Sequence, residues 1–424
     1  MYYAEMETEV GRVEFDIPET IAVYMTPKEY LRSLRLEEFV LAHCTCYSYR
    51  KSEQLINRAL NREPGEKIKV STLNDHVEAL GEKASEYLAD KTEEIIQEAF
   101  PGYEGDLTEE SIQKQLAQTY PEPSQPEDAT RNSQSFACQI EAFNAGKDTC
   151  DQIKREDLVD ATETCPEKTV YISVDDVGVG RQKEKRSKDY KKDRKRVENT
   201  VIHVESSGRK HIITAVGMKK AFAMLIAFLI SNDLLIDRHI VFFSDGAQNI
   251  RSCIEAFFSF RKPVVHMLDW YHLEKRMKEM LSMAVKGSKE TKLEIRNTLN
   301  RRLWAGNVDE AIQYLRVLPG KSIKNQQRLD EAVDYLERRK PHIACYALRS
   351  ILDYRNSSNP AEKANDRIVA TRQKHNGMSW SSGGSSALAV ITALEINGEL
   401  SSWISKGTIP FNINSAGSNE NKAA

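Results

Sequence analysis

Three segments of the sequence combine an apolar, strand-like run with acidic residues: YISVDDVGV, VFFSDGAQ and VVHMLDWYH. Val, Ile, Phe and Tyr favour an extended, pleated backbone. A carboxylate inside such a strand is costly to bury unless it is paired or bound to a cation. These acids therefore indicate chemistry or metal binding rather than packing. They are Asp175 and Asp176 in the first segment, Asp245 in the second and Asp269 in the third.

A further acid, Glu362, lies in the first turn of a helix predicted to start at Pro360. Carboxylate oxygens are the hard ligands that Mg²⁺ prefers. Two such ions, about 3.5–4 Å apart, can activate a water or a 3′-hydroxyl and stabilise the departing oxygen of a phosphodiester. This chemistry needs carboxylates from separate elements that the fold brings together. Their placement at strand ends and at a helix start is therefore more informative than their spacing along the chain.

The elements around these acids predict an α/β fold. The first strand is followed by two strand-like segments, NTVIHVES and KHIITAVG, joined by the hairpin signal Ser207-Gly208. An apolar helix over residues 219–231 comes next, and then strand, helix and strand: HIVFFSD, AQNIRSCIEAFFSF and PVVHMLD. This order matches an RNase H-like mixed sheet, with the acids at neighbouring strand ends.

From Trp270 onward, a series of helical patterns predicts an all-helical insertion in this core. Upstream, the segment PEPSQPEDATRNSQS is typical of a linker. We expect residues 1–100 to form an N-terminal helical domain, 101–168 a linker, 169–269 the first part of the catalytic core, 270–355 the insertion, 356–408 the last part of the core and 409–424 a disordered tail.

The N-terminal domain is predicted to contain three helices, the first starting at Pro27 after an extended leader. The second follows Ser48, and the third is capped by Ser71 and closed by Gly81. Short helices followed by one that presents polar side chains are typical of a helix-turn-helix, with an ordinary helical bundle as the alternative. In a helix-turn-helix, Arg50 and Lys51 would contact phosphates.

A basic run spans residues 181–196, with ten Lys or Arg and three acidic residues. A solvated hairpin tip is one interpretation, but its position just beyond the first acidic strand favours a loop that contacts phosphates. The candidate DNA contacts here are Lys183, Lys185, Arg186, Lys191 and Lys192. Arg372 and Lys374, downstream of Glu362, are further candidates, with a solvated helix face as the alternative.

The composition gives no global signature of a nucleic-acid-binding protein, because the formal net charge of the 424 residues is −3. A DNA-binding surface must therefore be local. We expect no secretory signal and no membrane span, since the longest apolar run is far too short. The seven cysteines are expected to be reduced; a zinc site at His43, Cys44 and Cys46 is a minor alternative.

The region from Thr169 to Trp403 resembles the bacterial insertion-sequence DDE transposases, whose RNase H-like core is interrupted by a helical insertion. Four motifs carry the resemblance: VDDVGV, SDGAQNI, LDWYHLEKRM and NPAEKANDRIVATRQKHNGMSWSSGG. The resemblance implies that Asp175, Asp245 and Glu362 form a catalytic triad that binds Mg²⁺ or Mn²⁺, as two ions. Asp269 and His272 match the family's D-x-x-H motif, which implies a supporting role.

The first motif departs from the family pattern, because relatives often have Asp-Gly or Asp-Glu where this chain has Asp175-Asp176. Side chains alternate along a strand, so these two acids lie on opposite faces and only one can be the ligand. We choose Asp175, with Asp176 in reserve. Gln248 and Asn249 also stand where the family often has an aromatic residue.

The implied function is cleavage and transfer of DNA strands at the terminal inverted repeats of an insertion sequence. The implied partners are those repeats and a target DNA, bound by a homo-oligomer in the cytoplasm with the nucleoid. Two alternatives stay open: an RNase H-like nuclease without strand transfer, and a transposase-derived DNA-binding protein without catalysis. Each acid also has a structural alternative, with Asp245 in a turn, Asp269 as a helix cap and Glu362 as a first-turn charge.

Overall fold

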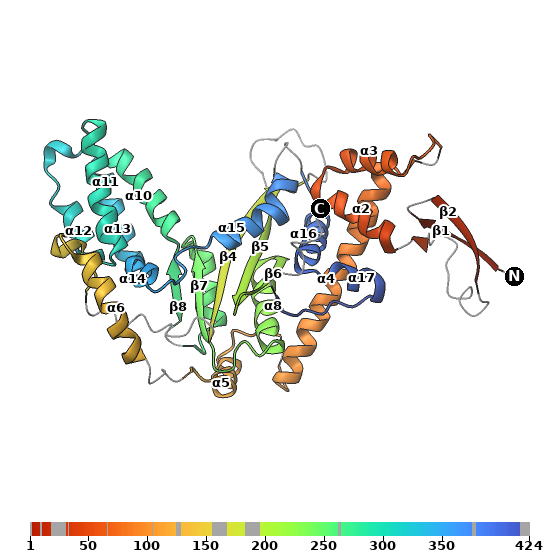
Figure 1. Ribbon diagram of the computed structural model, residues 1–424, viewed down its shortest axis with the longest axis horizontal. Helices are drawn as coiled ribbons and strands as arrows, with labels where there is room; N and C mark the ends of the chain where they lie inside the picture. Colours follow the sequence, from red (N-terminus) through yellow and green to blue (C-terminus); the bar gives the residue numbers. More distant parts are fainter. Residues whose placement is uncertain are drawn as a thin grey trace.

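The computed structural model describes residues 2–8, 11–17, 31–32, 34–65, 67–103, 105–123, 129–154, 168–182, 196–261, 264–374 and 379–415. A central mixed sheet separates two groups of helices (Figure 1). The helices between residues 270 and 351 lie at one end of the molecule, and the N-terminal helices and hairpin lie at the other. No helix in the described ranges is both long and apolar enough to cross a membrane.

The central sheet has the strand order β8-β7-β4-β5-β6-β9. β4, β5 and β6 form an antiparallel meander, whereas β7 and β8 run parallel to β4. Ser207 and Gly208, both with positive φ, make the tight turn between β5 and β6 that the sequence predicts. The strands are β4 (Thr169–Gly180), β5 (Arg196–Ser206), β6 (Arg209–Val216), β7 (His239–Ser244), β8 (Val265–Leu268) and β9 (Asn414–Ser415).

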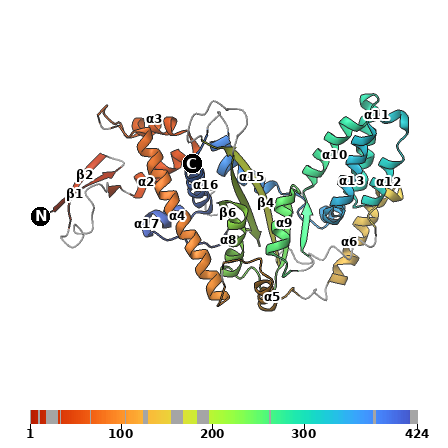
Figure 2. The same cartoon turned by 180° about the vertical axis from the view of Figure 1, so that it is seen from behind.

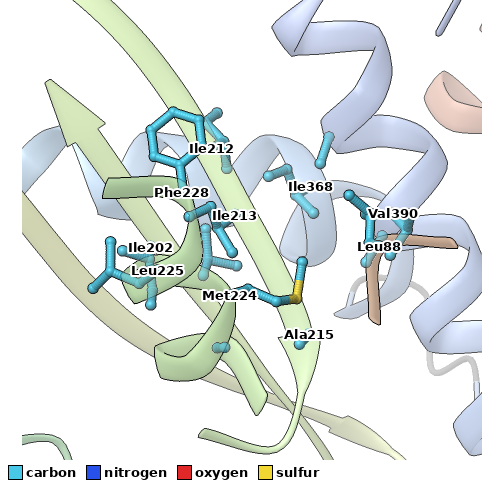
Figure 3. Close-up of a cluster of buried hydrophobic side chains, with 14 of the residues drawn as sticks. Leu88, Ile202, Ile212, Ile213, Ala215, Met224, Leu225, Phe228, Ile368 and Val390 are labelled. Atoms are coloured by element: carbon cyan, nitrogen blue, oxygen red, sulfur yellow. The ribbon is translucent and has the colours of Figure 1, made fainter. Parts of the chain in front are cut away.

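Helices cover both faces of this sheet. On one face, Phe242 of β7 packs edge-on against Phe258, with ring centroids 4.7 Å apart, and Ile202 of β5 lies beside Leu225 (Figure 3). On the other face, the side-chain amide of Asn199 donates to Ser385 at 2.9 Å. Figure 2 shows α9 on the face opposite α15. The first layer is α8 (Met218–Ser231) and α9 (Gln248–Phe257); the second is α15 (Asn359–Asn365), the π-helical η5 (Asp366–Lys374) and α16 (Ser382–Asn397).

The helices between β8 and α15 pack around a hydrophobic core of their own, which includes Leu273, Leu299 and Leu336. They interrupt the α/β core between its last parallel strand and α15. The prediction of an RNase H-like core with a helical insertion is therefore confirmed. The insertion contains α10 (Trp270–Ala284), α11 (Lys289–Trp304), α12 (Val308–Arg316), η3 (Gly320–Ser322), α13 (Gln326–Arg339), η4 (Lys340–His342) and α14 (Tyr346–Ile351).

The N-terminal helices share one hydrophobic core with the sheet. Leu36, Leu73 and Leu88 are buried in the same cluster as Ile213 and Val390 (Figure 3). The helix-turn-helix interpretation stays a prediction, but the three helices do not have a separate core. They are α2 (Leu34–Cys46), α3 (Tyr49–Ala59) and α4 (Val70–Ala99), preceded by the small sheet of β1 (Tyr2–Thr8), β2 (Gly11–Ile17) and β3 (Leu31–Arg32).

Gly81 does not close a helix, contrary to the sequence expectation, because α4 continues through it to Ala99. A Cβ atom at Gly81 would lie 2.5 Å from the backbone of Ala387 in α16. The glycine therefore allows two helices to cross closely. Likewise, Ser71 is not the cap: Lys69 precedes the helix and no side chain caps it.

The structure differs from the predicted linker over residues 101–168 in two places. Helix α5 (Glu110–Thr119) packs on the main core through Leu116, and Gln113 donates to the carbonyl of Phe257 at 3.1 Å. Helix α6 (Ala129–Asn144) and η1 (Thr149–Asp151) pack on the insertion, where Arg301 donates to Asp151 at 2.8 Å. Apolar spacing within each short helix was the missed signal.

The beginning of the predicted tail is also ordered. After α17 (Leu400–Lys406), Ile409 and Phe411 are buried and β9 pairs with β6. Glu399 accepts a hydrogen bond from the backbone amide of Phe411 at 2.6 Å. Residues 416–424 of the predicted tail lie outside the described residues.

Gly81→Leu should destabilise the fold, because its side chain would clash with the backbone of α16. Overpacking of this kind costs about 1–3 kcal/mol. Gly383→Ala is the matched control, since no atom lies within 4 Å of its Cβ position, and removing a helical glycine adds about 0.5–1 kcal/mol. Urea unfolding measures both. Equal stability of Gly81→Leu and wild type would contradict the close crossing.

Acid should also destabilise the fold through buried neutral histidines. Burial lowers the pKa of His211 to about 3, so between pH 6.5 and 3 the unfolded chain binds a proton that the folded chain does not. As the pH falls from 6.5 to 3, this group should therefore lower the free energy of unfolding by about 1.4 kcal/mol per pH unit. Burial raises the pKa of Glu399 to about 7, which acts in the opposite direction. The diagnostic quantity is thus the shallower pH slope of His211→Phe relative to wild type, measured by urea unfolding; identical slopes would exclude the effect.

Candidate metal centre

The strand register places three of the predicted acids in one row. Ser173 of β4 pairs with Phe243 of β7, and Ser244 of β7 pairs with Leu268 of β8. Continued past these pairs, the same register sets Asp175, Asp245 and Asp269 side by side. Because residues in register point to the same face, the three side chains project from one side of the sheet.

Asp175 and Asp176 point to opposite faces, as alternation predicts. Asp175 accepts a hydrogen bond of 2.6 Å from Asn365 of α15. Asp176 instead accepts from Thr200 of β5 at 2.6 Å and from Asn249 of α9 at 3.0 Å. Asp175 is therefore the member of the pair that faces the other acids.

Asp269 is fully buried and held from two sides. One carboxylate oxygen accepts from the backbone amide of His272 at 2.9 Å and caps α10. The other accepts from the backbone amide and the hydroxyl of Ser358, just before α15. Burial would raise the pKa of Asp269, but its bonds with His272 and Ser358 outweigh this and lower it. Asp269 thus ties the starts of two helices to the end of β8.

Glu362 lies in the first turn of α15, where Pro360 is one of the first helical residues, as predicted. Its Oε1 lies 3.5 Å from Nδ1 of His272, and the same nitrogen lies 3.3 Å from Oδ1 of Asp269. One ligand atom from each of Asp269, His272 and Glu362 lies within 4.8 Å of the others. The helix start therefore brings Glu362 to the row of aspartates.

Electrostatics connects Glu362 and His272 to the two remaining acids. Burial raises the pKa of Asp175, and the charge of Asp245 raises it further. Burial also raises the pKa of Glu362, with contributions from Asp269 and Asp175. The pKa of His272 is raised chiefly by Asp269, with help from Glu362 and Asp245. Burial is the largest cause for the two carboxyl groups, and the smaller contributions of the neighbouring acids show that these charges lie close together.

This donor set fits a divalent cation. None of the Lys and Arg side chains in the described ranges forms an ion pair with Asp175, Asp245 or Glu362. Carboxylate oxygens match the ligand preferences of Mg²⁺ or Mn²⁺, and the ligand atoms of Asp269, His272 and Glu362 lie close enough together to share one ion. A bound cation would offset both the burial of the Asp175 carboxylate, which is the main cause of its raised pKa, and its repulsion by Asp245.

Asp245 is exposed and begins the turn between β7 and α9. Its Oδ1 accepts from the backbone amide of Ala247 at 2.8 Å, so the predicted turn is present. Gly246 has φ +81°, and a Cβ there would lie 2.7 Å from Leu268. Asp245 can therefore both form this turn and lie in the row of acids, because only its Oδ1 accepts the turn's hydrogen bond.

Arg372 is not exposed, contrary to its prediction as a DNA contact. It is buried between the rings of Tyr49 and Trp380, and its Nε donates to the carbonyl of Cys44 at 3.1 Å. The basic side chain links η5 to the N-terminal helices, which periodicity within one helix cannot show. Lys374 is exposed on the same segment.

Other predicted contacts are exposed or lie outside the described residues. Arg50 and Lys51 are exposed at the start of α3, which begins close to the predicted position and is capped by Ser48. Outside the described residues lie Lys183, Lys185, Arg186, Lys191 and Lys192. Cys44 is buried and Cys46 is exposed, and the candidate metal group of the described residues includes neither.

Sequence reasoning missed Asn365 and Ser358, which orient Asp175 and Asp269. Asn365 lies three residues after Glu362, so both occupy one face of α15, and Asn365 donates to Asp175 from that face. The π-helical turn of η5 begins immediately afterwards. Such turns are frequent at functional sites. The E-x-x-N spacing was the available signal.

The chain matches the profile of a protein family and resembles a solved structure weakly. A solved structure titled "Drosophila P element transposase strand transfer complex" matches over 76% of this chain and 86% of that chain, at 10% identity and a TM-score of 0.21. A likeness of this extent carries no information about activity. No curated protein sequence matches this one. The profile of the uncharacterised protein family UPF0236 matches residues 148–406, which include the whole sheet except β9, the insertion and every acid of the row. The chain belongs to the UPF0236 family.

Proposed function

We propose that this protein is a DDE-type transposase, which cleaves and transfers DNA strands at the ends of an insertion sequence. The observation that carries the proposal is the row of Asp175, Asp245 and Asp269 on one sheet face, with Glu362 brought to it by α15. A cluster of acids in which no carboxylate forms an ion pair with a described Lys or Arg is costly in a folded protein unless it has a ligand. A divalent cation would be such a ligand, and it would in turn bind the phosphodiester.

In this proposal, Asp175, Asp245 and Glu362 hold a pair of Mg²⁺ or Mn²⁺ ions. Such ions activate a water or a 3′-hydroxyl and stabilise the leaving oxygen of the phosphodiester. Asn365 fixes the rotamer of Asp175 through its 2.6 Å hydrogen bond. Asp269 holds the start of α10, and so sets where His272 stands relative to Glu362.

Two DNA segments, a terminal inverted repeat and a target, are the proposed partners of a homo-oligomer. Exposed Arg50 and Lys51 on α3 and exposed Lys374 on η5 are the proposed phosphate contacts within the described residues. The basic run 181–196 directly follows the strand that bears Asp175 and is the remaining contact segment.

Substitution within the acid set should abolish cleavage. Asp175→Asn, Asp245→Asn and Glu362→Gln should each lower metal-dependent cleavage of an inverted-repeat duplex by about a thousandfold, equivalent to about 4 kcal/mol of transition-state stabilisation. Asp176→Asn is the matched control, because this neighbour faces Thr200 and Asn249 instead. It should stay within about tenfold of wild type.

Each outcome of this cleavage assay has one interpretation. Cleaved ends joined to a target duplex support the transposase, whereas cleavage without joining indicates the alternative RNase H-like nuclease. Repeat binding that survives every substitution, with no cleavage by wild type, indicates a DNA-binding protein without catalysis. Equal loss in Asp176→Asn and Asp175→Asn would overturn the assignment of Asp175.

Mn²⁺ should stabilise the folded protein. At a hundredfold excess over its dissociation constant, the metal should add about 2.7 kcal/mol to the free energy of unfolding. The effect should weaken as the pH falls, and at a higher pH than for ordinary carboxylates, because protons compete for Asp175 and Glu362, whose pKa values are raised chiefly by burial. Calorimetric titration with Mn²⁺ and thermal unfolding measure this. Unchanged affinity in the Asp245→Asn, Glu362→Gln double variant would show that the metal binds elsewhere.

A further inference from the structure

The helical insertion returns to the acidic row where α13 ends. Arg339 is the last residue of α13, and its guanidinium lies 3.6–3.7 Å from the position that a Cβ of Gly246 would occupy. Gly246 directly follows Asp245 in the turn after β7. An arginine of the insertion therefore lies beside the turn that carries an acid of the row.

The hydroxyl of Tyr335 lies near charged groups of both the insertion and the row of acids. Burial raises the pKa of Tyr335; Arg339 and Arg276 lower it, and Asp245 raises it. The hydroxyl thus lies within electrostatic range of both guanidinium groups and of Asp245. Arg339 also contacts the Tyr335 ring, with its Cζ 5.8 Å from the centroid.

Arg339 differs from its basic neighbours in its partners. Arg276 lies 3.6 Å from Glu279, and Arg251 of α9 lies 3.4 Å from Glu255. No carboxylate in the described part of the chain forms an ion pair with Arg339. Its aromatic contact and its place beside Gly246 orient the guanidinium but leave its charge without an anionic partner there.

An unpaired guanidinium beside a cluster of acids matches a phosphate group. A nucleic-acid backbone is repelled by four carboxylates, so its phosphates need fixed positive charge at the edge of the site. The planar guanidinium offers two parallel donors to phosphate oxygens, which a lysine cannot reproduce.

We infer that Arg339 is a phosphate-binding residue, which holds a backbone phosphate of the DNA strand next to Asp245. The helical insertion would then supply part of the substrate site rather than serve only as a spacer between two parts of the core. This inference rests on the proposed function, because it names a contact to the same DNA.

The test compares Arg339→Ala and Arg339→Lys with Arg338→Ala in the full-length protein. Arg338 is the matched control, because it is adjacent, exposed and bonded to the carbonyl of Asp334. Cleavage of the inverted-repeat duplex is measured against DNA concentration, with Mn²⁺ titration as a second readout. We expect Arg339→Ala to lower kcat/KM at least tenfold and Arg339→Lys to recover only part of it. Arg338→Ala and all Mn²⁺ affinities should match wild type.

The outcomes separate this inference from the proposed function. If wild type cleaves and Arg339→Ala cleaves equally well, the phosphate contact is wrong and the transposase proposal stands. If Arg339→Ala loses Mn²⁺ affinity or thermal stability as much as activity, Arg339 supports the fold and the inference is again wrong. If wild type does not cleave, the proposed function fails. Weaker binding of a labelled repeat duplex by Arg339→Ala than by Arg338→Ala would still support a phosphate contact.

Discussion

The register between β4, β7 and β8 is the constraint on which the rest of the site depends. Two parallel pairings bring Asp175, Asp245 and Asp269 into one row, although 94 positions separate the first from the last. A slip of one residue in either pairing would turn an acid to the opposite face. The buried side chains that fix the register, such as Phe242 against Phe258, therefore also position the chemistry.

Asp269 connects this row to the helices on either side of the insertion. One carboxylate oxygen caps α10, the first helix of the insertion, and the other accepts from Ser358 at the start of α15, after the insertion has ended. The two points where the insertion leaves and rejoins the core are thus held by a single buried carboxylate. Glu362 and His272 meet because the helices that carry them start at the same anchor.

The N-terminal helices are part of the same folded unit. Arg372 bonds to Cys44 and lies between Tyr49 and Trp380, and Gly81 lets α4 cross α16 closely. Arg372 belongs to η5, which directly follows α15, the helix that presents Glu362 and Asn365. The N-terminal helices therefore pack against the segment that continues from this helix.

Strand propensity and the order of elements were enough to predict the RNase H-like core, the insertion and the positions of Asp245 and Asp269 directly after strands. Those features follow from local patterns, since apolar alternation, hairpin residues and helix starts are encoded within a few positions. The expectation that the first strand ends at Asp175 and Asp176 was wrong, because β4 stays paired with β5 as far as Gly180. The ordered α5 and α6, the burial of Arg372 and the continuity of α4 through Gly81 were not predicted. Each depends on a partner from elsewhere in the chain.

The sequence by itself determined that Asp175 and Asp176 face opposite ways, because alternation is a property of any strand. Only the tertiary structure decided which of them faces Asp245, since that depends on which layer of helices covers each side of the sheet. It also decided that Asn365 bonds to Asp175 and that Arg339 packs beside Gly246. Contacts between residues distant in the chain are selected by the packing of whole elements, and no local pattern contains that information.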